Sequence, residues 1–175
     1  MSSAFAAPAG SSPVAPLWEI DPSEWDDVFA VNVRGVYLVC RAFLPGMIAR
    51  GDGDVVTVAS VTGKRPLPRR TPYAASKTAL HGLTATLAHE VGTLGVRVNT
   101  LSPGPVAGPR MARNFALEAS RVGGTPEDAE REFVSRAALG RMVTEDEVAE
   151  ATLAILRMRG LTGADVDLSG GMVAR

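Results

Sequence analysis

Three short apolar segments, at residues 54–59, 96–101 and 164–168, are separated by much longer stretches that carry signals for helices. Antiparallel strands can be joined by a turn of two residues, whereas parallel strands require a long crossover that is usually helical. An alternation of short strands with helices is therefore typical of a parallel sheet. The chain is predicted to adopt an α/β fold with a parallel sheet of at least these three strands.

Local signals for helix starts occur at four places. Asp21-Pro-Ser-Glu24 and Thr125-Pro-Glu-Asp128 each offer a capping oxygen, a proline at the first helical position and an acid at the third. Thr144-Glu-Asp-Glu147 is a capping box, and Thr71-Pro72 leads into a fourth helical stretch. We predict helices from near 22, 126 and 145, and a helix over 73–91. The expected core stripe of that last helix is Leu80, Leu83, Leu87 and Val91.

The composition is ordinary for a globular protein. The chain has 175 residues, of which 46% are hydrophobic and 21% are charged, as expected for a single domain over 1–175. Residues 1–16 are rich in Ala, Ser, Pro and Gly and are predicted to be irregular, and 105–140 is the longest stretch between core elements. A net charge of −1 gives no electrostatic reason to expect a nucleic acid or an acidic membrane surface as a partner.

The chain shows no targeting or membrane signal that we recognise. Its first residues lack the basic and apolar regions of a signal peptide, and no stretch approaches the run of about 18 apolar residues expected of a membrane span. The single cysteine, Cys40, lies in an apolar stretch and is predicted to be a buried thiol in a reducing compartment. We therefore expect a cytoplasmic protein without a membrane partner.

Candidate catalytic residues lie in the middle of the chain. In a helix over 73–91, Tyr73 and Lys77 are separated by one turn on the same face. A nearby ammonium stabilises the phenolate form of a tyrosine, so Tyr73 is predicted to exchange a proton near neutral pH. Ser60 follows the strand at 54–59, at the edge of a parallel sheet where ligands bind. Its hydroxyl is suited to hold the oxygen of a carbonyl or an alcohol.

These residues and several others together resemble the classical short-chain dehydrogenase/reductase family. Ser60-Val-Thr-Gly63 resembles the serine segment of that family, and Tyr73-Ala-Ala-Ser-Lys77 resembles its Tyr-x-x-x-Lys signature. Asn32 is similar to the helix asparagine of the catalytic tetrad, and Asn99-Thr-Leu-Ser-Pro-Gly104 to the turn under the nicotinamide. The closing segments are also similar: Thr144-Glu-Asp-Glu-Val-Ala149, Leu161-Thr-Gly163 and Ser169-Gly-Gly171. The resemblance covers roughly residues 9 to 175.

The resemblance implies reversible hydride transfer between a nicotinamide and an alcohol, ketone or aldehyde. Tyr73 would be the acid/base, and Ser60 would hold the substrate oxygen. Lys77 would support the tyrosine and hydrogen-bond the nicotinamide ribose, and Asn32 would support a proton-relay water near Lys77. An asparagine that satisfies backbone groups in a helix kink is a second reading of Asn32. The expected cofactor-binding residues are Tyr73, Lys77, Pro103, Gly104, Pro105 and Val106; a plain turn is the other reading of the last four.

The chain departs from the family pattern in its phosphate-binding segment. The first strands and the glycine-rich turn of a dinucleotide-binding half are not found in the sequence. The expected fold is thus the C-terminal portion of a doubly wound Rossmann sheet, in an N-terminally truncated relative, with the choice between NAD and NADP unreadable. Ala107-Gly108-Pro109 also stands where the family often has a threonine that holds the carboxamide.

Two functions follow from this combination. The first is an NAD(P)-dependent oxidoreductase that acts on a small alcohol or carbonyl substrate. The second is a catalytically silent fragment that acts only through oligomerisation or interaction. The family resemblance implies a homo-oligomer formed through the helices near 22–49 and 73–91, and it implies that residues 105–140 cover the substrate.

Other polar residues receive weaker interpretations. His81 and His89 lie eight positions apart on the helix after Tyr73 and are interpreted as solvated or interface histidines rather than metal ligands. The pairs Lys64-Arg65 and Arg69-Arg70 flank the loop before Tyr73. They are interpreted as a solvated loop, with attraction of an anionic substrate as the alternative.

Overall fold

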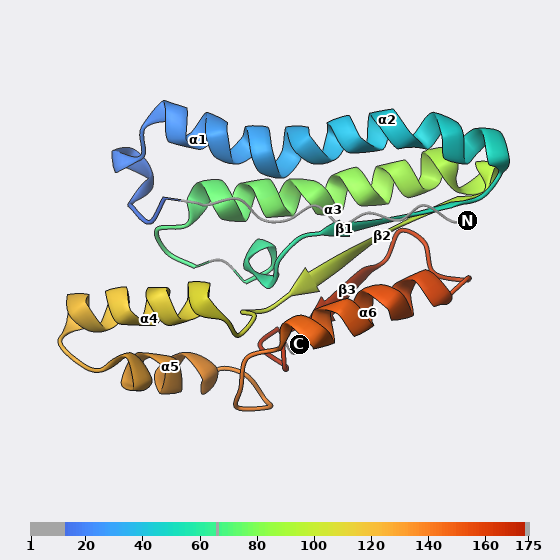
Figure 1. Ribbon diagram of the computed structural model, residues 1–175. Helices are drawn as coiled ribbons and strands as arrows, with labels where there is room; N and C mark the ends of the chain where they lie inside the picture. Colours follow the sequence, from blue (N-terminus) through green and yellow to red (C-terminus); the bar gives the residue numbers. More distant parts are fainter. Residues whose placement is uncertain (1–12, 66, 174–175) are drawn as a thin grey trace.

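The computed structural model describes residues 13–65 and 67–173 (Figure 1). The expectation for residues 1–16 and the first matched residues, from Ala9, fall largely on 1–12, outside the described residues. The helices are α1 (Pro22–Phe29), α2 (Gly35–Arg50), α3 (Thr71–Val91), α4 (Pro109–Val122), α5 (Pro126–Val134) and α6 (Glu145–Arg157). The strands are β1 (Gly53–Val58), β2 (Val96–Pro103) and β3 (Asp165–Leu168).

The three strands form one parallel sheet in the order β1-β2-β3, which confirms the predicted parallel α/β fold. Val55 pairs with Val98, and Thr100 pairs with Asp165. Helices α2 and α3 pack on one face of the sheet and α6 packs on the other, as Figure 1 shows. Helices on both faces of a parallel sheet make this a portion of a doubly wound, Rossmann-like fold.

The core is divided by the sheet into two layers. Successive strand residues point to opposite faces, so Val55 packs under α2 and α3 while Val56 packs under α6. The predicted stripe on α3 contributes to the first layer, where Leu80 and Val91 are buried and Leu83 and Leu87 are partly buried. This packing fixes α3, and with it Tyr73 and Lys77, against the carboxyl ends of β1 and β2.

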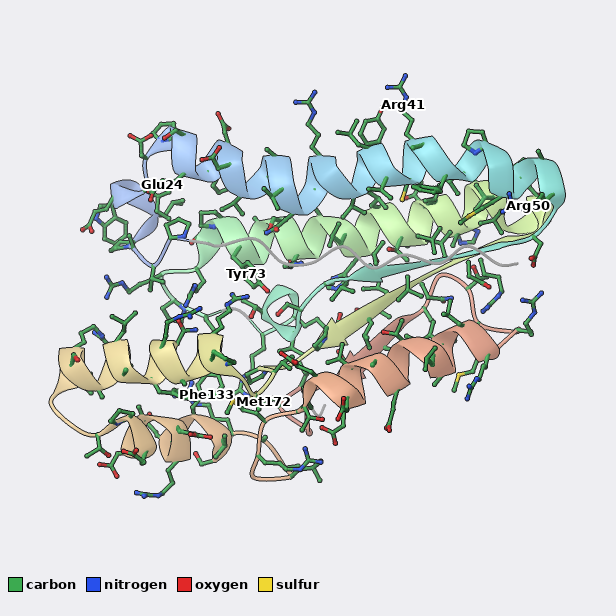
Figure 2. The ribbon with its side chains drawn as sticks, in the orientation of Figure 1. Glu24, Arg41, Arg50, Tyr73, Phe133 and Met172 are labelled. Atoms are coloured by element: carbon green, nitrogen blue, oxygen red, sulfur yellow. The ribbon has the colours of Figure 1, made fainter. Side chains whose placement is uncertain are left out.

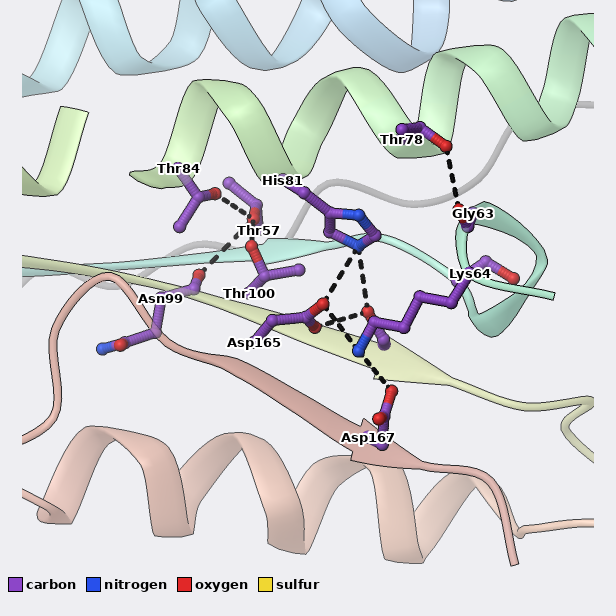
Figure 3. Close-up of polar contacts among 12 residues, drawn as sticks. Thr57, Gly63, Lys64, Thr78, His81, Thr84, Asn99, Thr100, Asp165 and Asp167 are labelled. Carbon is purple, nitrogen blue, oxygen red and sulfur yellow. Dashed lines mark hydrogen bonds and ion pairs between the residues drawn. The ribbon is translucent and has the colours of Figure 1, made fainter. Parts of the chain in front are cut away.

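Three buried threonines join α3 to the sheet by hydrogen bonds. The Oγ1 of Thr57 lies 2.8 Å from that of Thr84 and 2.9 Å from that of Thr100 (Figure 3). Buried hydroxyls are costly unless they find partners, and each of these does. The threonines come from β1, α3 and β2, so the bonds also favour one register between the helix and the strands.

The structure confirms the predicted starts of the three helices that have a capping side chain. Asp21 accepts a hydrogen bond from the Ser23 amide at 2.8 Å, and Glu24 completes the capping box of α1. Thr144 and Glu147 form the box of α6, and Thr125 caps α5. Two features were not predicted. Helix α4 occupies part of 105–140, and a π-helical turn, Ala30–Arg34, joins α1 to α2.

Two glycines allow a close approach at the start of the sheet. Gly51 ends α2 with φ +66°, and Gly95 precedes β2 with φ +84°. A Cβ atom at position 95 would lie 2.1 Å from the carbonyl oxygen of Gly51, whereas one at position 51 would have no neighbour within 4 Å. The two chain segments can therefore lie side by side only because residue 95 has no side chain.

The continuous helical run Pro22–Arg50 is the one described segment that is long and apolar enough to cross a membrane, judged by length and composition alone. Its mean hydropathy reaches 1.4. The sequence had predicted no membrane span, because no run of about 18 consecutive apolar residues occurs in it. Its inner side contributes Val36, Cys40 and Met47 to the core of the sheet. Its outer side exposes Val31, Tyr37, Leu38 and Phe43.

Candidate active site

The predicted residues Tyr73, Lys77 and Ser60 gather at the carboxyl end of β1. The Nζ of Lys77 donates a hydrogen bond to the Val58 carbonyl at 2.8 Å and lies 5.8 Å from the centre of the Tyr73 ring. Ser60 stands two residues beyond that carbonyl. Tyr73 is half-buried at the start of α3 (Figure 2). The structure thus brings a phenol, an ammonium and a hydroxyl to one end of the sheet.

The Ser60 hydroxyl is held by its own turn. It accepts a hydrogen bond from the Thr62 amide at 3.2 Å and lies 3.3 Å from the Thr62 hydroxyl. These contacts cap the 3-10 turn Val61–Gly63. The turn is braced against α3, where the Thr78 hydroxyl donates to the Gly63 carbonyl at 3.1 Å. Ser60 therefore has a fixed position relative to the helix that carries Tyr73.

Asn32 lies in the π-helical turn and is only 2% exposed. Its Nδ2 donates to the Ser76 hydroxyl at 3.0 Å, and that hydroxyl donates to the Tyr73 carbonyl at 2.8 Å. The π-helical turn thus places the side-chain amide of Asn32 against the first turns of α3. Ser76 was not among the predicted site residues. Its place between Tyr73 and Lys77, on the buried side of α3, was the available signal.

Lys77 is 1% exposed, and its environment disfavours the charged form. Burial, followed by repulsion from Arg110, lowers the pKa of Lys77 from 10.5 to about 8. Unfolded lysine keeps its proton up to about pH 10.5, so between about pH 8 and 10.5 the unfolded state binds more protons than the folded state. Stability is then expected to increase with pH across this window.

We predict that Lys77→Met flattens this rise. The lowered pKa corresponds to a free energy on the order of 3 kcal/mol, which the folded chain regains as Lys77 loses its proton. Urea unfolding at several pH values above neutrality measures the slope. Lys64→Met is the matched control, since the pKa of Lys64 is raised despite its partial burial, by hydrogen bonds to Asp165 and Asp167. The idea fails if Lys77→Met keeps the wild-type slope.

The turn at Pro103, Gly104, Pro105 and Val106 leaves the carboxyl end of β2 and is tied to later segments. The Gly104 amide donates to the Leu168 carbonyl at 2.7 Å, and a Cβ at this glycine would lie 2.9 Å from the Cα of Ser169. Val106 forms an isolated parallel bridge with Val143. Strand β2 includes Pro103, two residues beyond its predicted end. The four residues are therefore a firmly held turn beside the site, and α4 begins directly after it.

A polar cluster links the serine segment to β3, as Figure 3 shows. Lys64 pairs with Asp165 at 2.6 Å and with Asp167 at 2.5 Å, so it is not the solvated loop residue that was expected. Ser102 donates its proton to Asp165 at 2.6 Å and lies 3.3 Å from His81 Nε2. Since the Ser102 hydroxyl has one proton, His81 must donate from Nε2. His81 is thus a structural link rather than a solvated histidine.

The described residues hold no group of three or more His, Cys, Asp or Glu side chains arranged for a metal ion. They do offer donors for a polar organic ligand. Of the three N–H donors that a lysine ammonium carries, one in Lys77 goes to the Val58 carbonyl, which leaves donors for a ligand beside Tyr73.

Comparison with known proteins gives a consistent result. A family model described as short chain dehydrogenase matches residues 4–119. The dehydrogenase/reductase SDR family member 6 of Danio rerio is 35% identical over 158 residues, which are 89% of this chain and 62% of that protein. The 4-formylbenzenesulfonate dehydrogenase of Comamonas testosteroni is 39% identical over 158 residues, 89% of this chain and 60% of that protein. The chain spans about three fifths of the length of these curated relatives.

Solved structures are also similar. Sorbitol-6-phosphate 2-dehydrogenase from Erwinia amylovora has a TM-score of 0.92 at 27% identity, with 98% of this chain and 69% of that chain covered. An actinorhodin polyketide ketoreductase with NADPH has a TM-score of 0.91 at 29% identity, with coverage of 98% and 67%. An NAD+-bound xylitol dehydrogenase has a TM-score of 0.87 at 26% identity, with coverage of 96% and 68%. In sequence and in fold, the chain belongs to the short-chain dehydrogenase family.

Proposed function

We propose that the protein is an NAD(P)-dependent oxidoreductase that interconverts an alcohol and a ketone or aldehyde. The observation that carries this proposal is the buried ammonium of Lys77, placed 5.8 Å from the Tyr73 ring and hydrogen-bonded to the strand end that leads into Ser60. A buried lysine beside a phenol is an arrangement suited to moving a proton rather than to stabilising a core.

Each residue has a distinct part in the proposed reaction. In the direction of reduction, the Ser60 hydroxyl donates a hydrogen bond to the carbonyl oxygen and orients it. Tyr73 gives its proton to that oxygen, and the charge of Lys77 stabilises the phenolate that remains. Asn32 holds the first turn of α3 through Ser76. It would also support a relay water near Lys77. In oxidation, Tyr73 takes the proton back.

A nicotinamide dinucleotide would supply or accept the hydride in this scheme. The residues present fit its nicotinamide and ribose end, since Lys77 and Tyr73 offer donors and Pro103, Gly104, Pro105 and Val106 form the adjoining wall. Among the residues that the structure describes, there is no glycine-rich turn that would hold the phosphates. The similar structures include one with NADPH and one with NAD+.

We predict weak or absent binding of NADH and NADPH by the 175-residue chain itself. Phosphate groups contribute much of dinucleotide affinity through backbone amides at a helix start, and no glycine-rich turn of that kind occurs in this sequence. Isothermal titration calorimetry with each cofactor measures the affinity. A dissociation constant in the micromolar range would contradict this prediction.

Turnover is the test of the proposed function. The reading frame upstream of Met1 is translated, and any continuous extension is expressed together with the 175 residues. The protein is then assayed with a panel of ketones, aldehydes and alcohols by following NAD(P)H absorbance. Cofactor-dependent turnover supports the oxidoreductase. An upstream stop together with no turnover supports the silent fragment instead.

A second copy of the chain is the partner that we propose, through α1, α2 and α3. The outer side of α2 exposes Tyr37, Leu38 and Phe43. Between α2 and α3 lies a groove lined by Cys40, Leu44, Leu83 and Leu87, among others. Exposed apolar faces of this kind are typical of interaction surfaces. Burial raises the pKa of the single thiol, Cys40, so this thiol is a poor nucleophile. A cytoplasmic location is also part of the proposal.

A further inference from the structure

The segment before Tyr73 enters α3 through a strained turn. Arg69 has φ +65° and is the one non-glycine residue with a positive φ among those described. Such backbone conformations cost free energy for residues with a side chain, and they occur where a fixed geometry is needed. The turn places Arg70 at the N-cap position of α3, three residues before Tyr73. Arg70 is half-buried, in contrast to its exposed neighbour Arg69.

Helix α4 brings a second arginine to the same place. Arg110 is the second residue of α4, and it lies within electrostatic range of both Arg70 and Lys77. Two turns further along α4, Glu118 lies within range of Arg69. Both relations place the first turns of α4 alongside the segment that leads into Tyr73. Figure 1 shows this arrangement, with α4 below the start of α3.

The end of α3 that carries Tyr73 is therefore surrounded by positive charge. Burial lowers the pKa of Arg70 and of Lys77, and repulsion from Arg110 lowers both further. In the described part of the chain, Arg110 belongs to no ion pair. The acids of the nearby cluster, Asp165 and Asp167, are already paired with Lys64. A bound anion would relieve this repulsion.

We propose that the substrate carries an anionic group, a carboxylate, sulfonate or phosphate, that Arg110 and Arg70 bind while its carbonyl or hydroxyl group contacts Tyr73. This inference rests on the proposed function, because it takes Tyr73 as the group that meets the substrate. Guanidinium groups bind such oxygens through paired hydrogen bonds, which gives orientation as well as attraction. The arginines are then specificity-determining residues. The phosphates of a dinucleotide are the other anions that Arg110 could bind, and the test separates the two.

The test compares keto acids with their uncharged methyl esters, using levulinate and methyl levulinate and homologues of other lengths. The protein with its full reading frame is expected to prefer at least one keto acid over its ester by tenfold or more in kcat/KM. Arg110→Gln should remove that preference and leave the KM for the cofactor unchanged. Arg113→Gln is the matched control, since Arg113 is also exposed on α4, one turn further along.

Three results would overturn the proposal. The first is an equal preference for acids and esters across the series. The second is an equal loss with both substrates in Arg110→Gln. The third is a raised KM for NAD(P)H alone, which assigns Arg110 to the cofactor phosphate. Binding of levulinate to the 175-residue chain is also measured by NMR. This measurement does not require turnover, so it tests the anion site independently of the proposed function. If levulinate binds and Arg110→Gln abolishes this binding, the anion site is supported even without turnover. If only the esters are turned over, the oxidoreductase function is supported and the anion site is not.

Discussion

Replacing Tyr73 by phenylalanine is expected to reduce turnover by about a thousandfold and to leave cofactor affinity nearly unchanged. The change removes one oxygen from a half-buried ring at the start of α3 and leaves the ring itself in place. A positioned acid or base contributes about a hundredfold to ten-thousandfold to a reaction rate, which sets the size of the effect. Steady-state kinetics with saturating cofactor, on the protein that shows turnover, measures it.

The chain offers a matched control for this experiment. Its second tyrosine, Tyr37, is exposed on α2. Tyr37→Phe removes the same oxygen at a position that is distant in the sequence from Ser60 and Lys77. Turnover of that variant should equal that of the wild type. If Tyr73→Phe also retained full turnover, Tyr73 would not be the acid/base.

The largest expected loss of stability comes from Gly95→Ala. The new methyl group would lie 2.1 Å from the Gly51 carbonyl oxygen, and alanine would also have to adopt φ +84°. Two backbone segments must separate to relieve the contact, at the point where β1 and β2 begin. We expect a loss of about 4 kcal/mol or more in the free energy of unfolding, which is among the largest effects of single substitutions.

Gly51→Ala separates the two causes of that loss. Position 51 has φ +66° but open space around the added methyl group. Its cost should be that of the left-handed conformation alone, about 1 kcal/mol. Urea denaturation of the two variants measures the difference. Equal losses would show that the close approach of the two glycines is not what limits substitution at position 95.

Features with local causes could be predicted from the sequence. Helices α1, α5 and α6 begin where Asp21, Thr125 and Thr144 supply a capping oxygen, and the structure confirms all three. Helix α4 was missed because its N-cap residue, Gly108, has no side chain to cap the helix. The parallel sheet could be predicted because each strand is a short apolar run, and the strand ends differ by one or two residues from the expected ones.

In the candidate site, too, the features with local causes could be predicted and the contacts between distant segments could not. The spacing of Ser60, Tyr73 and Lys77 is visible in the sequence because a strand end and one helical turn set their geometry. The contact of Asn32 with Ser76 joins two different helices, and that of Lys64 with Asp165 joins the serine segment to the last strand. Arg110 approaches Lys77 only once α4 has packed. Such contacts depend on the folded arrangement, so residue spacing did not reveal them.

The π-helical turn at Ala30–Arg34 limits how the length of this chain can vary. A π turn accommodates one more residue than an α-helical turn does, and each residue of a helix advances it by about 100°. Deleting a single residue there would restore a regular α-helical turn and remove the widened backbone on which Asn32 lies. Asn32 would then turn away from Ser76. An insertion or a deletion of one residue in this turn would therefore disconnect the helix from the first turn of α3.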